Sequence, residues 1–157
     1  MSKSRKRVER ALEEAGLPNT VREMAGDCTT AASAAATLGI EVDRIAKSIL
    51  FRGRESGGMV LLLTAGGNSV DPARAEALAE EALERPDAAM VRASTGFAIG
   101  GVAPVGHLCP VRAFADPRLW DFATIWAAAG TPRHVFEATP EALAAMTGAQ
   151  KARFTAS

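Results

Sequence analysis

Residues 45–64 read IAKSILFRGRESGGMVLLLT, and the rest of the chain can be placed around this stretch. The runs 45–51 and 59–64 are apolar and rich in β-branched residues, and each has the length of a strand. The segment between them, residues 53–58, is polar and contains three glycines, which favours a turn. The sequence therefore predicts a β-hairpin here.

Helix signals lie on both sides of the hairpin. Upstream, residues 8–15 have helical spacing and end before Gly16, and the alanine-rich residues 31–38 follow a cap at Thr29 or Thr30. Downstream, Asp71 and Pro72 form a cap-then-proline start for a helix whose buried stripe reaches residue 83. A second cap-then-proline pair, residues 139–140, predicts a last helix that ends at residue 148.

Strand signals fill most of the remaining chain. Together with the hairpin they give about seven strands and four helices, without regular βαβ alternation. This order predicts a single α+β domain over residues 1–157, with a mixed, largely antiparallel sheet or a partly closed barrel and packed helices. Besides the hairpin, the expected strands are residues 20–24, 88–91, 111–115, 122–127 and 134–138.

The formal net charge is zero, so the chain has no overall field that would attract a polyanion. Contact with nucleic acid would need a local basic patch. Two terminal clusters are candidates, and the alternative interpretation of each is a set of solvated surface charges. The clusters are Lys3, Arg5, Lys6, Arg7 and Arg10, and Lys151 with Arg153.

Cys28 and Cys109 are the only cysteines, and neither has a metal-ligand spacing to another cysteine or to a histidine. Isolated thiols suit a reducing compartment. The N-terminus is charged rather than apolar, and the longest apolar run, residues 59–65, is too short to cross a bilayer. We therefore expect a cytoplasmic protein with no membrane contact, no metal and no cofactor.

Lys47 stands out in the first hairpin strand. Side chains alternate along a strand, so Lys47 should share its face with Ile45, Ile49 and Phe51. A lysine on an apolar face has two explanations. It can protect a sheet edge or extend its ammonium to water, or it can hold a positive charge at the mouth of a pocket.

Residues 94–107 read STGFAIGGVAPVGH and contain four glycines and a proline. Glycine lets another group approach the backbone, and free N–H groups in such loops bind anions or stabilise an oxyanion. The spacing matches neither a dinucleotide fingerprint nor a P-loop. A bent connecting loop is the alternative. His107 is a candidate pocket residue, whereas His134 is expected to have a surface or packing role.

Four segments in a fixed order give the chain a resemblance to a known family. They are residues 30–51, which include I-x-K-S-x-x-F at residues 45–51, the strand that ends before Asp71, S-T-G-F-x-x-G-G-V-x-P-x-G at residues 94–106, and D-F-A-T-I-W at residues 121–126. With this order and spacing the chain resembles the YbaK/ProX family of aminoacyl-tRNA deacylases, which is related to the editing domain of bacterial prolyl-tRNA synthetases. The resemblance covers roughly residues 8–148.

The resemblance implies hydrolysis, in trans, of the ester between tRNA and a small wrong amino acid such as Cys, Ala or Ser. It implies tRNA(Pro) as one candidate tRNA and prolyl-tRNA synthetase as one candidate partner, with no DNA partner. It assigns catalysis to Lys47, Gly100 and Gly101. By the same matching of motifs, the candidate substrate-binding residues are Thr30, Ser48, Ser94, Thr95, Gly96, Pro104 and His107.

One segment departs from the family pattern. Many members carry Ser-Gly-Gly after the strand that corresponds to residues 122–126, whereas this chain has Ala127, Ala128, Ala129 and Gly130. The departure bears on amino-acid specificity and on how water is positioned. It also keeps open a second function, a non-catalytic module of the same fold that binds tRNA ends or a synthetase.

Overall fold

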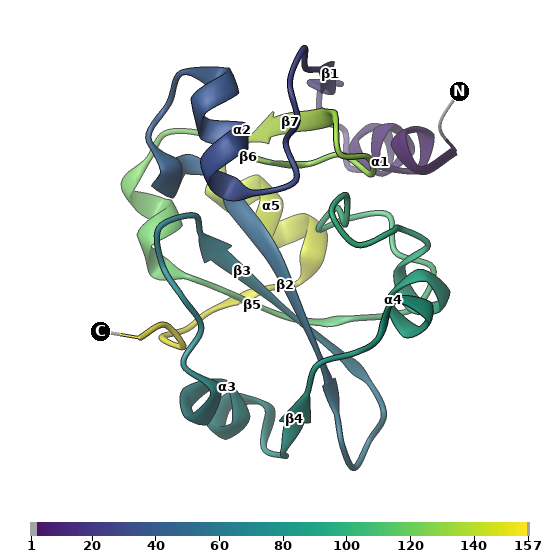
Figure 1. The fold of residues 1–157 in the computed structure, drawn as a ribbon, viewed down its shortest axis with the longest axis vertical. Helices are drawn as coiled ribbons and strands as arrows, with labels where there is room; N and C mark the ends of the chain where they lie inside the picture. Colours follow the sequence, from purple (N-terminus) through teal and green to yellow (C-terminus); the bar gives the residue numbers. More distant parts are fainter. Residues whose placement is uncertain (1–2, 157) are drawn as a thin grey trace.

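The computed structural model describes residues 3–156, which form two sheets and five α-helices (Figure 1). The larger sheet has the strand order β4-β2-β3-β5-β8, and the smaller one has the order β1-β7-β6. The strands are β1 Arg22–Glu23, β2 Ala46–Gly53, β3 Met59–Ala65, β4 Leu83–Glu84, β5 Arg112–Ala115, β6 Ile125–Ala128, β7 His134–Ala138 and β8 Gln150–Lys151. The α-helices are α1 Lys3–Glu14, α2 Ala31–Leu38, α3 Pro72–Ala79, α4 Ala88–Thr95 and α5 Pro140–Thr147.

The predicted hairpin is confirmed as β2 and β3, which pair antiparallel from Ala46 opposite Ala65 to Arg52 opposite Met59. Every residue of β3 is buried, since β3 lies between β2 and β5 with apolar clusters on both faces. One face packs with α1, α5 and the loop after α4, and the other packs with α3. A third cluster joins α2 to β6 and β7.

The predicted α+β class with a mixed, largely antiparallel arrangement is confirmed. Among the strand pairs of the described residues, β3–β5 and β5–β8 are parallel and the other four are antiparallel, and an isolated bridge between Ile45 and Trp126 is also parallel. The barrel alternative is wrong, because neither sheet closes on itself. Figure 1 shows α3 and β4 at one end of the β2–β3 hairpin, and α2 with β6 and β7 at the other.

Most of the helix boundaries follow the predicted capping residues. Thr30 accepts a hydrogen bond from the Ser33 amide in a capping box, and Asp71 accepts one from the Ala73 amide. The helix predicted to reach residue 83 ends at Ala79 instead, because Glu80 adopts a left-handed conformation with φ 61°. Leu83 then pairs with Gly53 as part of β4.

The strand predicted at residues 88–91 is wrong, since these residues begin α4. Asp87 caps this helix by accepting a hydrogen bond from the Met90 amide, and Gly96 ends it in a left-handed conformation. The short apolar run fits either a strand or a helix, and the cap decides between them.

Candidate active site

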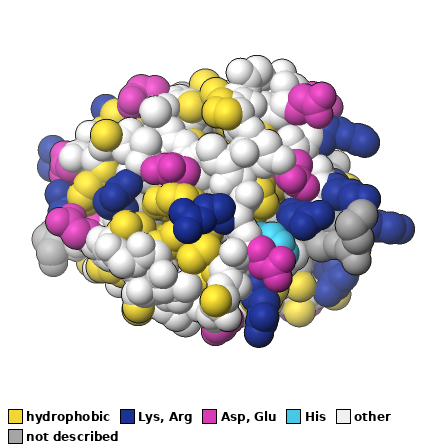
Figure 2. Space-filling view, turned by 90° about the horizontal axis from the view of Figure 1, so that it is seen from above, with side chains coloured by type: hydrophobic (Ala, Val, Ile, Leu, Met, Phe, Trp, Pro, Cys, Tyr) yellow, Lys and Arg dark blue, Asp and Glu magenta, His cyan; other side chains and the backbone are white. Residues whose placement is uncertain are grey.

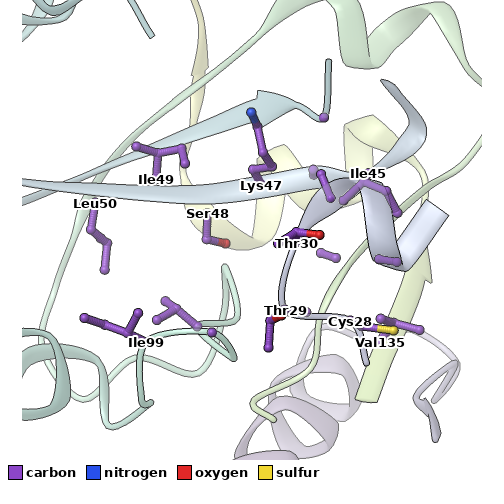
Figure 3. Close-up of a pocket in the computed structure, with 18 of the residues that line it drawn as sticks. Cys28, Thr29, Thr30, Ile45, Lys47, Ser48, Ile49, Leu50, Ile99 and Val135 are labelled. Atoms are coloured by element: carbon purple, nitrogen blue, oxygen red, sulfur yellow. The ribbon is translucent and has the colours of Figure 1, made fainter. Parts of the chain in front are cut away.

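A cavity of about 530 Å³ lies along one edge of β2. Its walls come from α2 and the turn before it, from β6 and β7, from α4, and from the glycine loop, which we define as residues 96–106. Ile45 and the β2 residues Ala46 to Leu50 line it, a length of roughly 16 Å at the usual rise per residue of a strand. In Figure 3, Ile45 lies near one end and Leu50 near the other.

The hydrogen bonds of β3 show why this edge of β2 is available. The Leu63 carbonyl and the Ala65 amide both bond to Asp116, so these residues direct their main-chain groups toward β5. In an antiparallel pair the directions alternate, so Leu62 and Thr64 bond toward β2, where they face Ile49 and Lys47. Ser48 and Leu50 therefore direct their main-chain groups to the opposite edge.

That opposite edge is only partly covered in the described residues. β4 pairs with Arg52 and Gly53, and Trp126 forms a single bridge with Ile45. Between these two contacts, the main-chain groups of Ser48 and Leu50 border the cavity. An unpaired strand edge offers both donors and acceptors to another molecule.

The two faces of β2 carry different groups in this stretch. Figure 3 shows the side chains of Ser48 and Leu50 pointing to the side where Ile99 lies, whereas Lys47 and Ile49 point the other way. This confirms that Lys47 and Ile49 share a face. Ile45 does not join them, since it packs in the cluster with Trp126.

Lys47 is one of the residues that line the cavity, and its Nζ already has a hydrogen-bond partner in the protein. Its Nζ donates a hydrogen bond of 2.6 Å to the Asn68 carbonyl, and Asn68 Nδ2 donates to the buried Asp116. Burial lowers the pKa of Lys47, and the charges of Asp116 and Asp43 oppose that shift only in part. The bond to the Asn68 carbonyl holds Lys47 Nζ at a fixed position.

Ser48 presents the opposite situation. Its Oγ is shielded from solvent and has no hydrogen-bond partner among the described residues. Leaving a buried hydroxyl without a partner costs about 1–3 kcal/mol. A polar group of a ligand that came within hydrogen-bonding distance of this oxygen would recover that free energy.

The two ends of the cavity have different chemistry. At one end Cys28, Ala34, Ile45, Trp126 and Val135 form a closed apolar surface, and burial, with a smaller contribution from Asp27, raises the pKa of the Cys28 thiol. The other end is bounded by Leu50, Val91, Pro86, the exposed Ile99 and the exposed Arg85. The Arg85 guanidinium lies 5.0 Å from the centre of the Phe51 ring.

The structure brings four of the predicted site residues to the cavity, namely Lys47, Ser48, Thr30 and Gly100. The Thr30 hydroxyl is occupied by its cap of α2. Gly101 does not line the cavity: its amide donates to the Ala98 carbonyl, and a Cβ there would lie 2.9 Å from the Thr131 backbone. Its contacts therefore hold the glycine loop in place.

The other five candidates do not line this cavity. The Thr95 hydroxyl donates to the Val91 carbonyl and accepts from the Phe97 amide, and Gly96 ends α4. Pro104 and His107 line a separate cavity of about 140 Å³. Ser94 lies in the last turn of α4, where its carbonyl accepts from the Cys109 amide.

Sequence reasoning missed several cavity residues. Arg85, Ile99, Trp126 and Cys28 come from four separate segments, and no local spacing connects them. Trp126 lies in the D-F-A-T-I-W motif, which is the one signal that pointed to its segment. Among the described residues, no group of three His, Cys, Asp or Glu side chains could hold a metal ion. No described helix is long and apolar enough to cross a membrane.

The chain as a whole resembles several known proteins. The model of the aminoacyl-tRNA editing domain matches residues 25–146. YwhH of Bacillus subtilis, whose function is uncharacterised, is 32% identical over 125 residues, which are 80% of this chain and 79% of YwhH. EbsC of Enterococcus faecalis, a candidate Cys-tRNA(Pro)/Cys-tRNA(Cys) deacylase, is 28% identical over 130 residues, which are 82% of this chain and 79% of EbsC.

Solved structures agree with the sequence matches. The crystal structure of a candidate trans-editing enzyme for prolyl-tRNA synthetase has a TM-score of 0.93 and 42% identity, and the alignment covers 100% of this chain and 99% of the other. The hypothetical protein APE2540 has a TM-score of 0.87 and 25% identity, with 96% and 99% covered. The chain therefore belongs to the aminoacyl-tRNA editing domain family.

Proposed function

We propose that this protein is an aminoacyl-tRNA deacylase that acts in trans in the cytoplasm, with its active site in the cavity along β2. The observation that carries the proposal is the unpartnered Ser48 Oγ on the cavity wall, beside the main-chain groups of the open β2 edge. Polar groups without partners at a cavity are what an aminoacyl ester needs for its carbonyl and amine. Family membership supplies the substrate class.

The two ends of the cavity suggest how the substrate lies. The closed apolar end, at Trp126, would take the amino-acid side chain, because its surface is small and uncharged. The open end, with Ile99 and Arg85, would take the terminal adenosine and its phosphate. The ester would then lie in the middle of the cavity, whose lining includes Ser48, Lys47 and Gly100.

This placement favours a small uncharged amino acid, and Cys, Ala and Ser are the first candidates. The uncharged residues Ala127 and Ala128 line the same part of the wall. tRNA(Pro) is the first tRNA to test, because one structural relative is described as an editing enzyme for prolyl-tRNA synthetase.

In the proposed reaction, water attacks the ester carbonyl and the ribose oxygen leaves with a proton that the water supplied. Among the described residues, no carboxylate and no histidine lines the cavity. An aminoacyl ester is already activated, so the protein contributes mainly position and stabilisation of charge. Lys47 supplies a fixed positive charge, and groups of the substrate carry the proton.

The test is single-turnover hydrolysis of a panel of charged tRNAs. The panel contains Cys-, Ala- and Ser-tRNA(Pro), with correctly charged Pro-tRNA(Pro) as the control. We expect at least one mischarged tRNA to be hydrolysed about 100-fold faster than in buffer, while Pro-tRNA(Pro) is spared. If every rate equals the rate in buffer, the protein is not a deacylase of these substrates. Tight binding without turnover would instead support the non-catalytic module.

A further inference from the structure

The side chain of Arg7, on α1, turns inward onto the glycine loop. Its Nη2 donates to the Thr95 carbonyl at 3.1 Å, and its Nε donates to the Gly106 carbonyl at 3.2 Å. The guanidinium carbon lies 4.5 Å from the centre of the Phe97 ring, which is fully buried. Arg7 therefore differs from Lys6 and Arg10 on the same helix, whose side chains are exposed.

These contacts join the two ends of one loop. Thr95 and Gly106 flank the segment that carries Ile99, Gly100 and Val102 into the cavity wall. A guanidinium is a rigid planar fork with five donors, so one side chain can hold two carbonyls at a fixed separation. A lysine ammonium lacks this fixed geometry.

Glycines make the close approach of α1 possible. A Cβ at Gly96 would lie 2.3 Å from Arg7 Nη2, and one at Gly106 would lie 3.2 Å from the Arg7 main-chain oxygen. Both glycines have positive φ, at 80° and 78°. Gly130 packs in the same way against Ser4, where a Cβ would lie 2.8 Å from the main-chain carbonyl.

Contacts with His107 also hold the interior of the glycine loop. His107 Nε2 bonds to the Ala103 carbonyl at 2.6 Å, and its ring contacts the edge of Phe97. Burial lowers the pKa of His107, and the nearby charge of Arg7 lowers it further, against the hydrogen bond to Ala103.

From this geometry we propose that Arg7 is a positioning residue for the reaction proposed above, and the inference rests on that function. Arg7 fixes both ends of the glycine loop, so that Ile99, Gly100 and Val102 keep their places along the substrate. It acts from α1, which lies outside residues 25–146 that match the editing-domain family. Of the five clustered N-terminal cations, Arg7 is thereby assigned to the loop rather than to contact with tRNA.

The experiment compares Arg7→Gln and Arg7→Lys with Lys6→Gln, a control at an exposed position of the same helix. Amide hydrogen exchange, followed by mass spectrometry without substrate, reports on residues 96–106. Multiple-turnover deacylation over a range of tRNA concentrations then separates kcat from KM. We expect Arg7→Gln to exchange its loop amides at least about tenfold faster while β2 and β3 stay protected. Its kcat should fall about tenfold with little change in KM.

Arg7→Lys should restore part of both effects, because it keeps the charge near Phe97 but loses the fork. Lys6→Gln should match the wild type in the exchange of residues 96–106. Unchanged loop exchange in Arg7→Gln would overturn the inference, as would a kcat equal to that of the wild type. So would a loss of activity that simply follows Tm across all three variants. If the wild-type protein hydrolyses no charged tRNA, the proposed function is wrong. The exchange data would still decide whether Arg7 holds the loop.

Discussion

Lys47 and Ser48 are neighbours on opposite faces of β2, and they differ in whether their polar atoms have hydrogen-bond partners. On one face, Lys47 is charged, bonded to the Asn68 carbonyl and linked through Asn68 to the buried Asp116. On the other face, Ser48 has a buried hydroxyl with no protein partner. Lys47 attracts attention in the sequence, yet the structure already explains part of its position. Ser48 looks ordinary in the sequence and is the residue that still lacks a partner.

This difference shows how structural and functional signals can be separated at a cavity. A satisfied polar group can stabilise the fold whether or not a ligand binds. An unsatisfied buried group costs stability until a ligand binds. The surface charge is a poor guide to the active site. In the view of Figure 2, basic side chains are densest on the right, where α1 lies, while acidic and apolar side chains are mixed across the rest.

The largest expected effect is on the Lys47 face. Lys47→Ala should lower kcat/KM for the best mischarged tRNA by about 100-fold, because the fixed charge beside the ester is lost. Lys47→Arg should recover little, since the wide guanidinium cannot take the place of a compact ammonium. Rates and thermal melting are measured together. Near wild-type rates for Lys47→Ala would show that Lys47 has only a structural role, through its bond with the Asn68 carbonyl.

Ser48→Ala tests the other face and should give a smaller loss, about tenfold in kcat/KM, since one neutral hydrogen bond to substrate is removed. Its stability should be equal to the wild type or higher by about 1 kcal/mol, because an unpartnered hydroxyl is gone. Chemical denaturation measures the second quantity. A clear loss of stability would show that Ser48 has a structural partner after all, and would remove the contrast between the two faces.

The smallest effect is the pH dependence of stability. The pKa of Lys47 is lowered in the folded protein, so the folded state holds this proton less tightly than the unfolded state. Below both pKa values the charged lysine therefore weighs against folding, and this penalty disappears as pH rises from the lowered pKa toward 10.5. The wild type should gain stability relative to Lys47→Met over that range, as measured by urea unfolding at a series of pH values. A constant difference would mean that the ammonium is not desolvated.

Local signals in the sequence were enough for much of the fold. The β2–β3 hairpin follows from two apolar runs and a glycine-containing turn, and the helix caps at Thr30 and Asp71 act within a few residues. The failures are at α4 and at the end of α3. There a short apolar run and a left-handed Glu80 depend on the surrounding structure, and local composition does not specify them.

The site was only partly predictable for a related reason. The motifs around residues 47 and 100 gave the segments that border the cavity, but they could not separate residues that face it from residues that support it. Gly100 lines the cavity, whereas Gly96, Gly101 and Gly106 allow close packing against Arg7 or Thr131. Arg85 and Cys28 reach the cavity only through the tertiary fold, so no spacing in the sequence could have found them.

The most direct test of the account is a crystal structure with a non-hydrolysable substrate analogue, 3′-alanylamino-3′-deoxyadenosine. We expect its amide group beside β2, with Ser48 Oγ in a hydrogen bond of about 2.7–3.0 Å to the analogue. The alanyl methyl group should point toward Trp126, and the adenine should lie near Ile99 and Arg85. An analogue bound away from the β2 edge, with Ser48 Oγ still lacking a partner, would contradict the proposed active site.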